Sequence, residues 1–357
     1  MKVENLNYKD FRNLEDVKLS LHPGKNIFYG DNGQGKTNLL EGIYICSSGK
    51  SHRTRFEKEL ITIGKREAHI NITINKNYRL ETIDVHIRAD GRKGIAVNKT
   101  PIKKYGELYG RLLTVIFSPE EMGIIKGSPN KRRKFMDLEL CQLSPVYYQS
   151  LRNYYKVLKQ RNNLLKTISK GGDQISSLEP WDIQLTDYGN KIIRYRREFI
   201  EKIKPLSDDT HYRLTGIQGF DIKYSADVSE DDFADKLAYA TKKDLLYGMT
   251  SVGPHRDDIC FMLSGRDLRV FGSQGEQRSA AISAKLSEIE LIREEVMDTP
   301  VLLLDDIFSE LDNRRRKLLI EQMEDLQMVI TCTDDDIARY IGRNCRKFYV
   351  KTGVIFA

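Results

Sequence analysis

The segment YGDNGQGKTNLLEGI, residues 29–43, decides the fold of this chain because it contains the pattern G-x-x-x-x-G-K-[ST]. Residues 26–29 (NIFY) predict a strand before the loop, and residues 38–43 predict the start of a helix after it. In such a loop the glycines let backbone N–H groups turn toward an anion, and the helix N-terminus adds partial positive charge. The segment therefore predicts a nucleotide site on an α/β domain. The alternative is a glycine-rich turn that binds nothing.

The side chains of this loop have distinct expected roles. Lys36 supplies a full positive charge for the β- and γ-phosphates, and Thr37 supplies a hydroxyl to Mg²⁺. The residues expected to surround the nucleotide are Gly30, Asp31, Asn32, Gly33, Gln34, Gly35, Lys36, Thr37 and Asn38.

Bulk properties of the chain exclude several classes of protein. Its 357 residues suffice for two domains or one two-lobed domain. The longest purely aliphatic run, residues 301–304, is far too short to span a bilayer, and charged residues near the N-terminus break any signal-peptide core. The five scattered cysteines have no C-x-x-C spacing, which is typical of thiols in a reducing compartment. We expect a cytoplasmic protein without membrane contacts.

The net charge of +7 is concentrated in short basic runs at residues 52–55, 131–134 and 314–317. Such runs occur on nucleic-acid-binding surfaces, but they are equally typical of solvated helix faces. Charge alone therefore permits nucleic-acid binding without establishing it.

The first third of the chain has the pattern of strands. Residues 2–8 and 15–21 predict two strands, and residues 61–97 alternate with period two, which predicts a small antiparallel sheet. Residues 112–117 predict a buried strand. The pairs Ser118-Pro119, Ser128-Pro129 and Ser144-Pro145 then mark three helix starts, the first with a capping-box glutamate. Closely spaced helix starts predict a helical lobe.

Within that lobe, two apolar stripes flank the break at Gly171-Gly172. Together they predict a helical hairpin with about two heptads of coiled-coil character. The stripes consist of Leu151, Tyr155, Leu158, Asn162 and Leu165, and then of Trp181, Leu185, Tyr188, Ile192 and Tyr195.

Later elements complete the outline. We expect a strand near residues 259–263, a helix from about Gly275 to Met297, a strand at residues 328–333, and a closing hairpin around Thr352-Gly353.

A second part of the nucleotide site is predicted at VLLLDD, residues 301–306. Four aliphatic residues place Asp305 at the carboxyl end of a buried parallel strand, where it would hold Mg²⁺ together with Thr37. Asp306 would face the γ-phosphate and polarise the attacking water, so Asp306 and Lys36 are the predicted catalytic residues. The alternative is an ordinary strand that ends in an aspartate turn.

The spacing of these two motifs is informative, because 269 residues separate Lys36 from Asp305. Compact GTPases and nucleotide kinases place them much closer, so a large insertion is folded between the halves of one sheet. Ser273 and Gly275 lie in FGSQGEQRSAA, where a helix begins, 32 residues before Asp305. That helix start is a second candidate anion site.

The order of these motifs resembles the ABC-type ATPase head of SMC and RecF proteins. The resemblance implies a P-loop α/β lobe that carries an antiparallel β subdomain, and an inserted helical lobe with a short helical hairpin. Its boundaries would be residues 1–117 for the first part of the ATPase lobe, 118–285 for the helical lobe and 286–357 for the rest. In this class ATP, bound with Mg²⁺, joins two heads, because Ser273 and Gly275 of each chain would cap the γ-phosphate held by its partner.

Within the class, long segments resemble the RecF family in particular. The resemblance implies a weak, DNA-stimulated ATPase of recombinational repair that forms an ATP-dependent homodimer. It would bind double-stranded and gapped DNA and help RecO/RecR-type mediators load the recombinase, with ATP hydrolysis releasing the dimer. The segments are YKDFRN (8–13), SPEEMGIIKGSPNKRRKFMD (118–137), GPHRDD (253–258), SQGEQR (273–278) and LLLDDIFSELD (302–312).

Some residues depart from the wider pattern. Gln274 stands where the ABC signature has its first glycine, and Asp306 stands where most members carry glutamate. Because aspartate is one methylene shorter, slow hydrolysis is expected. No clear lobe-junction glutamine is found, and the segment 117–120 takes its place. Arg12 has two open roles, a contact to the phosphates or a structural surface role.

Three other functions compete with this interpretation. A transporter ATPase subunit would share the fold but not the RecF-like segments. A structural SMC head would need hundreds of residues of heptads, and a nucleotide kinase would need closely spaced motifs.

Overall fold

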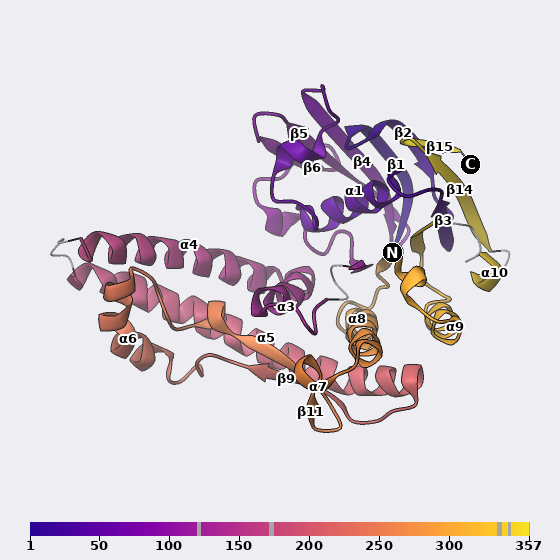
Figure 1. Ribbon diagram of the computed structural model, residues 1–357. Helices are drawn as coiled ribbons and strands as arrows, with labels where there is room; N and C mark the ends of the chain where they lie inside the picture. The colour runs from indigo at the N-terminus through magenta and orange to yellow at the C-terminus, as the bar shows by residue number, and fades with distance from the viewer. Residues whose placement is uncertain (120–122, 171–174, 334–337, 342–343, 357) are drawn as a thin grey trace. The chain divides into compact units, whose positions relative to one another are not determined.

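The computed structural model describes residues 1–357 except 120–122, 171–174, 334–337, 342–343 and 357 (Figure 1). The chain forms two compact units: the sheet unit, Met1–Met122 with Glu288–Ala357, and the helical unit, Gly123–Ser287. The corresponding breaks predicted from the sequence lie after residues 117 and 285. Among the helices that the structure describes, none combines the length and the apolar character that crossing a bilayer requires.

The sheet unit contains a mixed, mostly parallel sheet in the order β15-β14-β3-β13-β12-β8. All its pairings are parallel except that of β15 with β14. Every residue of β12 and β13 is buried, as central parallel strands require, so these strands are apolar runs. The strands are β3 (Lys25–Tyr29), β8 (Thr114–Phe117), β12 (Val301–Asp305), β13 (Met328–Cys332), β14 (Cys345–Lys351) and β15 (Val354–Phe356).

A second, antiparallel sheet of the same unit has the order β2-β1-β4-β5-β6-β7. The predicted period-two pattern is confirmed in β4, where Ala68, Ile70, Ile72 and Ile74 are buried and the residues between them face outward. The two N-terminal strands were predicted, but their place in this sheet was not. Its strands are β1 (Lys2–Phe11), β2 (Leu14–Ser20), β4 (Glu67–Lys76), β5 (Arg79–Arg88), β6 (Lys93–Val97) and β7 (Thr100–Pro101).

Helix α1 (Lys36–Ser48) packs against strands of both sheets, among them β12, β13 and β4. Gly42 lies so close to β1 that a Cβ there would come within 2.5 Å of the Tyr8 ring, and the Tyr8 hydroxyl donates to the Leu39 carbonyl at 2.9 Å. Nearly all residues of α1 are buried for this reason, polar ones included. The other helices that lie wholly within the described part of this unit are η1 (Glu57–Leu60), η2 (Tyr105–Glu107), η5 (Ile307–Glu310), α9 (Asn313–Gln322) and α10 (Ala338–Ile341).

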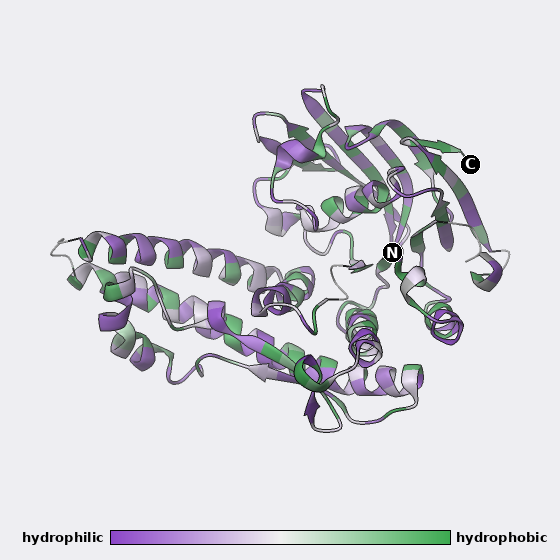
Figure 2. Ribbon diagram, viewed as in Figure 1, coloured by the Kyte–Doolittle hydropathy of each residue, from purple (hydrophilic) through white to green (hydrophobic). Residues whose placement is uncertain are grey.

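The helical unit is built around the hairpin of α4 and α5, in which polar and apolar residues alternate along both helices (Figure 2). Two of the predicted helix starts are confirmed: α3 begins at Pro129, and α4 begins after Ser144, whose hydroxyl accepts from the Tyr147 N–H. The capping box predicted after Ser118 lies partly outside the described residues. The helices are α3 (Pro129–Leu143), α4 (Pro145–Ile168), η3 (Ile175–Leu178), α5 (Glu179–Thr215), α6 (Phe233–Tyr247), η4 (Pro254–Arg256) and α7 (Leu268–Phe271).

The helical unit also holds a small antiparallel sheet, β11 (Arg266–Asp267), β10 (Asp258–Leu263) and β9 (Phe220–Ser225). Helix α8 (Gln274–Val296) begins in this unit and continues into the sheet unit. Strand β10 and helix α8 were predicted, whereas β9 and α6 were not.

The buried face of α4 matches the predicted stripe only in part. Leu158 and Leu165 are buried as predicted, but Tyr155 is 43% exposed, whereas Tyr154 and Arg161 are almost wholly buried. Apolar spacing missed part of the face because a charged side chain, Arg161, lies within it.

Buried arginines are a general feature of this unit. Among the described residues, Arg132, Arg161 and Arg196 are at most 1% exposed. Arg161 donates to the buried Asp244 carboxylate at 2.6 Å, to Asp182 at 2.5 Å and to the Thr250 hydroxyl at 2.9 Å. A buried ion is tolerated only when such partners replace its hydration.

The segment GPHRDD, residues 253–258, accepts hydrogen bonds from the other two arginines. Arg196 donates to Asp257 at 2.8 Å and to the Pro254 carbonyl at 2.7 Å, while Arg132 forms a bidentate pair with Asp258 at 2.6 and 2.8 Å. This segment therefore fixes α3 and α5 to the small sheet, which gives it a structural role.

Arg161→Met should lower the free energy of unfolding by about 3–5 kcal/mol, because it leaves the buried Asp244 carboxylate without a cation. Urea unfolding followed by circular dichroism measures the change. The matched control is Arg197→Met, whose partner Glu230 lies 2.7 Å away in a partly exposed pair. It should cost less than about 1 kcal/mol, and equal losses in the two variants would contradict the argument.

Candidate nucleotide site

The phosphate-binding loop, residues 30–37, leaves β3 at the carboxyl edge of the parallel sheet. Gly30 and Gly35 have φ values of +144° and +107°, which disfavour any side chain. A Cβ at Gly30 would come within 2.4 Å of the Val350 carbonyl oxygen, and a Cβ at Gly35 would come within 2.5 Å of Asn13 Oδ1. The loop is therefore closely packed on both sides, and glycine is required at these two positions.

Two turns from distant parts of the chain hold the loop in place. From the β1–β2 turn, Asn13 Nδ2 donates to the Gln34 carbonyl at 3.1 Å, and Asn13 Oδ1 accepts from Asn38 Nδ2 at 2.8 Å. From the β14–β15 turn, the Gly353 N–H donates to the Gln34 carbonyl at 2.9 Å and the Thr352 N–H donates to Gln34 Oε1 at 2.6 Å. This role of Asn13 was not predicted from the sequence.

Lys36 is the buried cation of the loop, with 7% of the residue exposed. Its Nζ donates to the Asp31 carbonyl at 2.7 Å and to the Gly30 carbonyl at 2.5 Å. Burial lowers the pKa of Lys36, while the negative charges of Asp306 and Asp305 oppose that shift. An anion bound in the loop would take the place of the water that the buried ammonium group has lost. It would accept hydrogen bonds from Lys36 Nζ in place of the loop carbonyls.

Thr37 and Asp305 meet at the same edge of the sheet. The Thr37 hydroxyl donates to Asp305 Oδ1 at 2.8 Å across a sequence separation of 268 residues, and the Thr331 hydroxyl donates to the same oxygen at 2.7 Å. Hydroxyl and carboxylate oxygens are the ligands that Mg²⁺ takes in nucleotide sites. The residues present therefore fit the ion that the sequence predicts here.

Asp306 follows β12 in a left-handed backbone conformation, with φ +50°. Its N–H donates to the Thr331 hydroxyl at 3.1 Å and to the Thr331 carbonyl at 3.2 Å. Aspartate tolerates this conformation better than most residues, and such backbone positions cluster at functional sites. Thr331 thus positions both acids, a role that its place at the end of a strand alone did not reveal.

Arg12 is engaged with Glu41 of α1. Its Nε and one terminal nitrogen donate to the two Glu41 oxygens at 2.9 and 2.7 Å, and its other terminal nitrogen donates to the Glu59 carbonyl at 2.8 Å. Burial would raise the pKa of Glu41, but hydrogen bonds from Arg12 and Ser51 hold it below its ordinary value. Arg53 also reaches Glu41, at 3.3 Å. These contacts give Arg12 a structural role, while its contact to the phosphates stays a prediction.

The predicted signature lies in the helical unit, at the start of α8. The Ser273 N–H donates to Glu276 Oε2 at 2.8 Å, and the Ser273 hydroxyl accepts from the Glu276 N–H at 3.2 Å, which together form a capping box. The serine O–H remains a donor. A Cβ built on Gly275 meets nothing within 4 Å, so this helix start has open space beside it.

A phosphate-binding loop on a parallel sheet, with a threonine–aspartate pair at the adjoining strand end and a helical insertion, defines an ABC-type ATPase head. The model of the RecF/RecN/SMC N-terminal domain matches residues 2–355. An SMC head bound to the C-terminal winged-helix domain of ScpA has the same fold, with a TM-score of 0.57 and 16% identity over 99% of this chain and 96% of that chain.

Closer relatives narrow this class. The DNA replication and repair protein RecF of Lachnospira eligens is 48% identical over 93% of both chains, and that of Clostridium novyi is 42% identical over 99% of both. A structure of the recombination mediator protein RecF with ATP, in the RecFOR pathway, has a TM-score of 0.93 and 35% identity, covering 99% of this chain and 97% of that chain. The chain belongs to the RecF family. This membership decides against the transporter subunit and the nucleotide kinase.

Asn13→Ala should weaken nucleotide binding by about tenfold, because two hydrogen bonds of roughly 0.5–1.5 kcal/mol each then no longer hold the loop. Titration with a fluorescent ATP analogue measures the affinity. Asn75→Ala is the control, since Asn75 bonds to Glu4 at 2.8 Å on the antiparallel sheet. A loss of equal size in both variants would show that the effect is not specific to the loop.

Proposed function

We propose that this chain is an ATP-dependent DNA-binding protein of recombinational repair. The observation that carries the proposal is the hydrogen bond between Thr37 and Asp305, at 2.8 Å, which joins the two halves of a nucleotide site within a RecF-family chain. ATP bound with Mg²⁺ drives dimerisation. The dimer binds duplex DNA near single-strand gaps, and slow hydrolysis releases it.

Residues of the sheet unit have distinct roles in binding and hydrolysing the nucleotide. The backbone of Gly30–Thr37 and the Lys36 ammonium hold the phosphates, while Thr37 and Asp305 hold Mg²⁺, which neutralises charge between the phosphates. Asp306 accepts the proton of the attacking water, and Thr331 fixes both acids in place. Asn32, Gly33 and Gln34 complete the loop.

Dimerisation depends on the signature of the partner chain. The Ser273 hydroxyl is used as an acceptor within its own capping box, so its proton is available to a phosphate oxygen of the partner. The start of α8 adds partial positive charge, and the open space beside Gly275 admits the phosphate without a steric clash. Nucleotide bound between two heads then joins them.

The basic runs contribute unequally to a DNA surface. Arg53 donates to Asn38 at 2.8 Å and contacts Glu41, so part of its charge serves the nucleotide lobe itself. Arg55 is exposed. In the run at 131–134, Arg132 is buried against Asp258, whereas Lys131 and Lys134 are exposed. A substitution of Arg55 therefore tests DNA contact with less disturbance of the nucleotide lobe than a substitution of Arg53.

The partners follow from the family. The solved RecF structure is named as part of the RecFOR pathway, which supports RecO/RecR-type mediators as partners of this chain. The recombinase is the protein that the complex helps to load at the gap.

A mixing experiment tests the shared site. Lys36→Met removes the cation from the phosphates and should abolish ATP-driven dimerisation, since one such contact is worth several kcal/mol. Ser273→Arg should abolish dimerisation as well but leave the ATP affinity of the monomer nearly unchanged.

Mixed together, the two variants should form dimers again, because one intact loop meets one intact signature. Sedimentation velocity with ATP measures all three samples. A normal dimer from Ser273→Arg alone, without any gain on mixing, would contradict the shared site.

DNA binding should be ATP-dependent and sensitive to salt. With about six phosphate contacts, affinity for a gapped duplex should fall by roughly three orders of magnitude between about 50 and 200 mM salt. Sequence preference should be slight.

Arg55→Glu should weaken binding measured by fluorescence anisotropy and leave dimerisation intact. Arg79→Glu, the same charge change on β5, is the control. Equal affinity in the two variants would move the DNA surface away from residues 52–55.

A further inference from the structure

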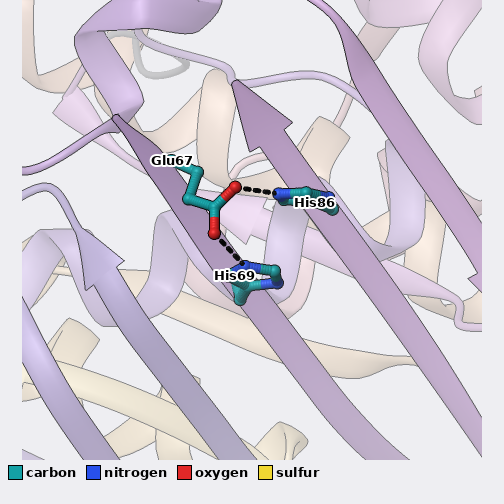
Figure 3. A group of neighbouring side chains, drawn as sticks. All are labelled: Glu67, His69 and His86. Atoms are coloured by element: carbon teal, nitrogen blue, oxygen red, sulfur yellow. Dashed lines mark hydrogen bonds and ion pairs between the residues drawn. The ribbon is translucent and has the colours of Figure 1, made fainter. Parts of the chain in front are cut away.

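A cluster of potential metal ligands lies on the face of the antiparallel sheet opposite to the buried apolar side chains of β4. His69 of β4 and His86 of β5 are direct partners in the antiparallel ladder (Figure 3). Glu67 precedes His69 by two residues, so it projects from the same face of the strand. The register of one hairpin thus places three side chains of metal-binding chemistry together.

The three side chains converge on one point. The two imidazole rings are stacked, with centroids 4.1 Å apart and an interplanar angle of 12°. Their Nε2 atoms both face the Glu67 carboxylate, His86 at 3.0 Å and His69 at 3.5 Å (Figure 3). The three ligand atoms all lie within 4.8 Å of one another.

These separations are close to those around a bound zinc ion. With bonds of about 2.1 Å, two ligands of a tetrahedral centre lie about 3.4 Å apart. The two stacked rings would have to turn so that both Nε2 lone pairs point at one ion, and the exposure of all three side chains leaves room for that rotation. The strands below stay fixed, because β4 and β5 pair along their whole length.

Neighbouring charges set limits on the affinity. Lys9 of β1 is the ladder partner of His69, and Arg88 is the partner of Glu67, so both place positive charge near the cluster. The cluster therefore offers one carboxylate and two imidazoles, with Lys9 and Arg88 as nearby cations.

We propose that Glu67, His69 and His86 form a binding site for a divalent transition-metal cation, for which Zn²⁺ is the best match. Two imidazoles and one carboxylate suit zinc, whereas Mg²⁺ and Ca²⁺ prefer oxygen ligands throughout. Three protein ligands leave a fourth position open toward solvent, for water or a donor from another molecule. The site is independent of the nucleotide and of the proposed function.

Calorimetric titration of the untagged full-length protein with ZnCl₂ tests the proposal. We expect one saturable site, and with Co²⁺ as a spectroscopic substitute we expect the visible absorption of a tetrahedral nitrogen and oxygen environment. His69→Gln and His86→Gln should each weaken binding by at least about tenfold, since even the loss of a hydrogen-bond partner of a ligand costs that much. Circular dichroism should show that both variants remain folded.

Two controls distinguish this site from zinc binding elsewhere on the chain. Lys9→Gln should tighten Zn²⁺ binding, because it removes a positive charge beside His69. Cys260 and Cys345 are partly accessible thiols, and replacing either with serine should leave binding unchanged. Unchanged affinity in both histidine variants, a site that disappears with either cysteine, or the absence of saturable binding would each overturn the proposal.

Discussion

The hydrogen bond from Thr37 to Asp305 is the interaction on which the sheet unit depends. It links a residue that follows β3 with the last residue of β12, and the strand between them, β13, contributes Thr331 to the same carboxylate. This geometry requires the helical unit to fold as a separate insertion, because β8 and β12 flank that insertion and still pair in parallel. The positions of Asp305 and Asp306 beside the loop therefore follow from sheet topology, which explains why 268 residues can separate Thr37 from Asp305 in sequence.

The sequence predicted those parts of the site that have a local signature. The loop glycines, Lys36 and the aliphatic run before Asp305 are recognisable because each motif follows from the chemistry of one short segment. The contacts of Asn13 and Gly353 with Gln34 could not be predicted, since they join turns near the two ends of the chain and leave no periodic pattern. A structural role for Arg12 was one of two predicted, but its partner could not be predicted, because Glu41 lies 29 residues away and belongs to no recognisable motif.

The helical unit shows a limit of predicting buried helix faces from hydrophobic periodicity. Its core is held by Arg132, Arg161 and Arg196 with their carboxylates, so the buried faces of α4 and α5 are partly charged. Hydrophobic periodicity finds such helices but misses the charged part of their buried faces, as Arg161 of α4 shows. Buried ion pairs add little net stability compared with apolar packing. A slip of α4 along α5 would nevertheless separate Arg161 from Asp182, and a shift of α3 would separate Arg132 from Asp258.

The buried Glu41 has a mechanical consequence. It anchors Arg12 from the β1–β2 turn, and Ser51 and Arg53 from the loop after α1, to a helix whose first turn carries Lys36 and Thr37. Because α1 is packed against strands of both sheets, a displacement of residues 51–53 would have to move this helix or break their contacts with Glu41. One buried carboxylate therefore couples the surface loop after α1 to the helix that begins with Lys36 and Thr37.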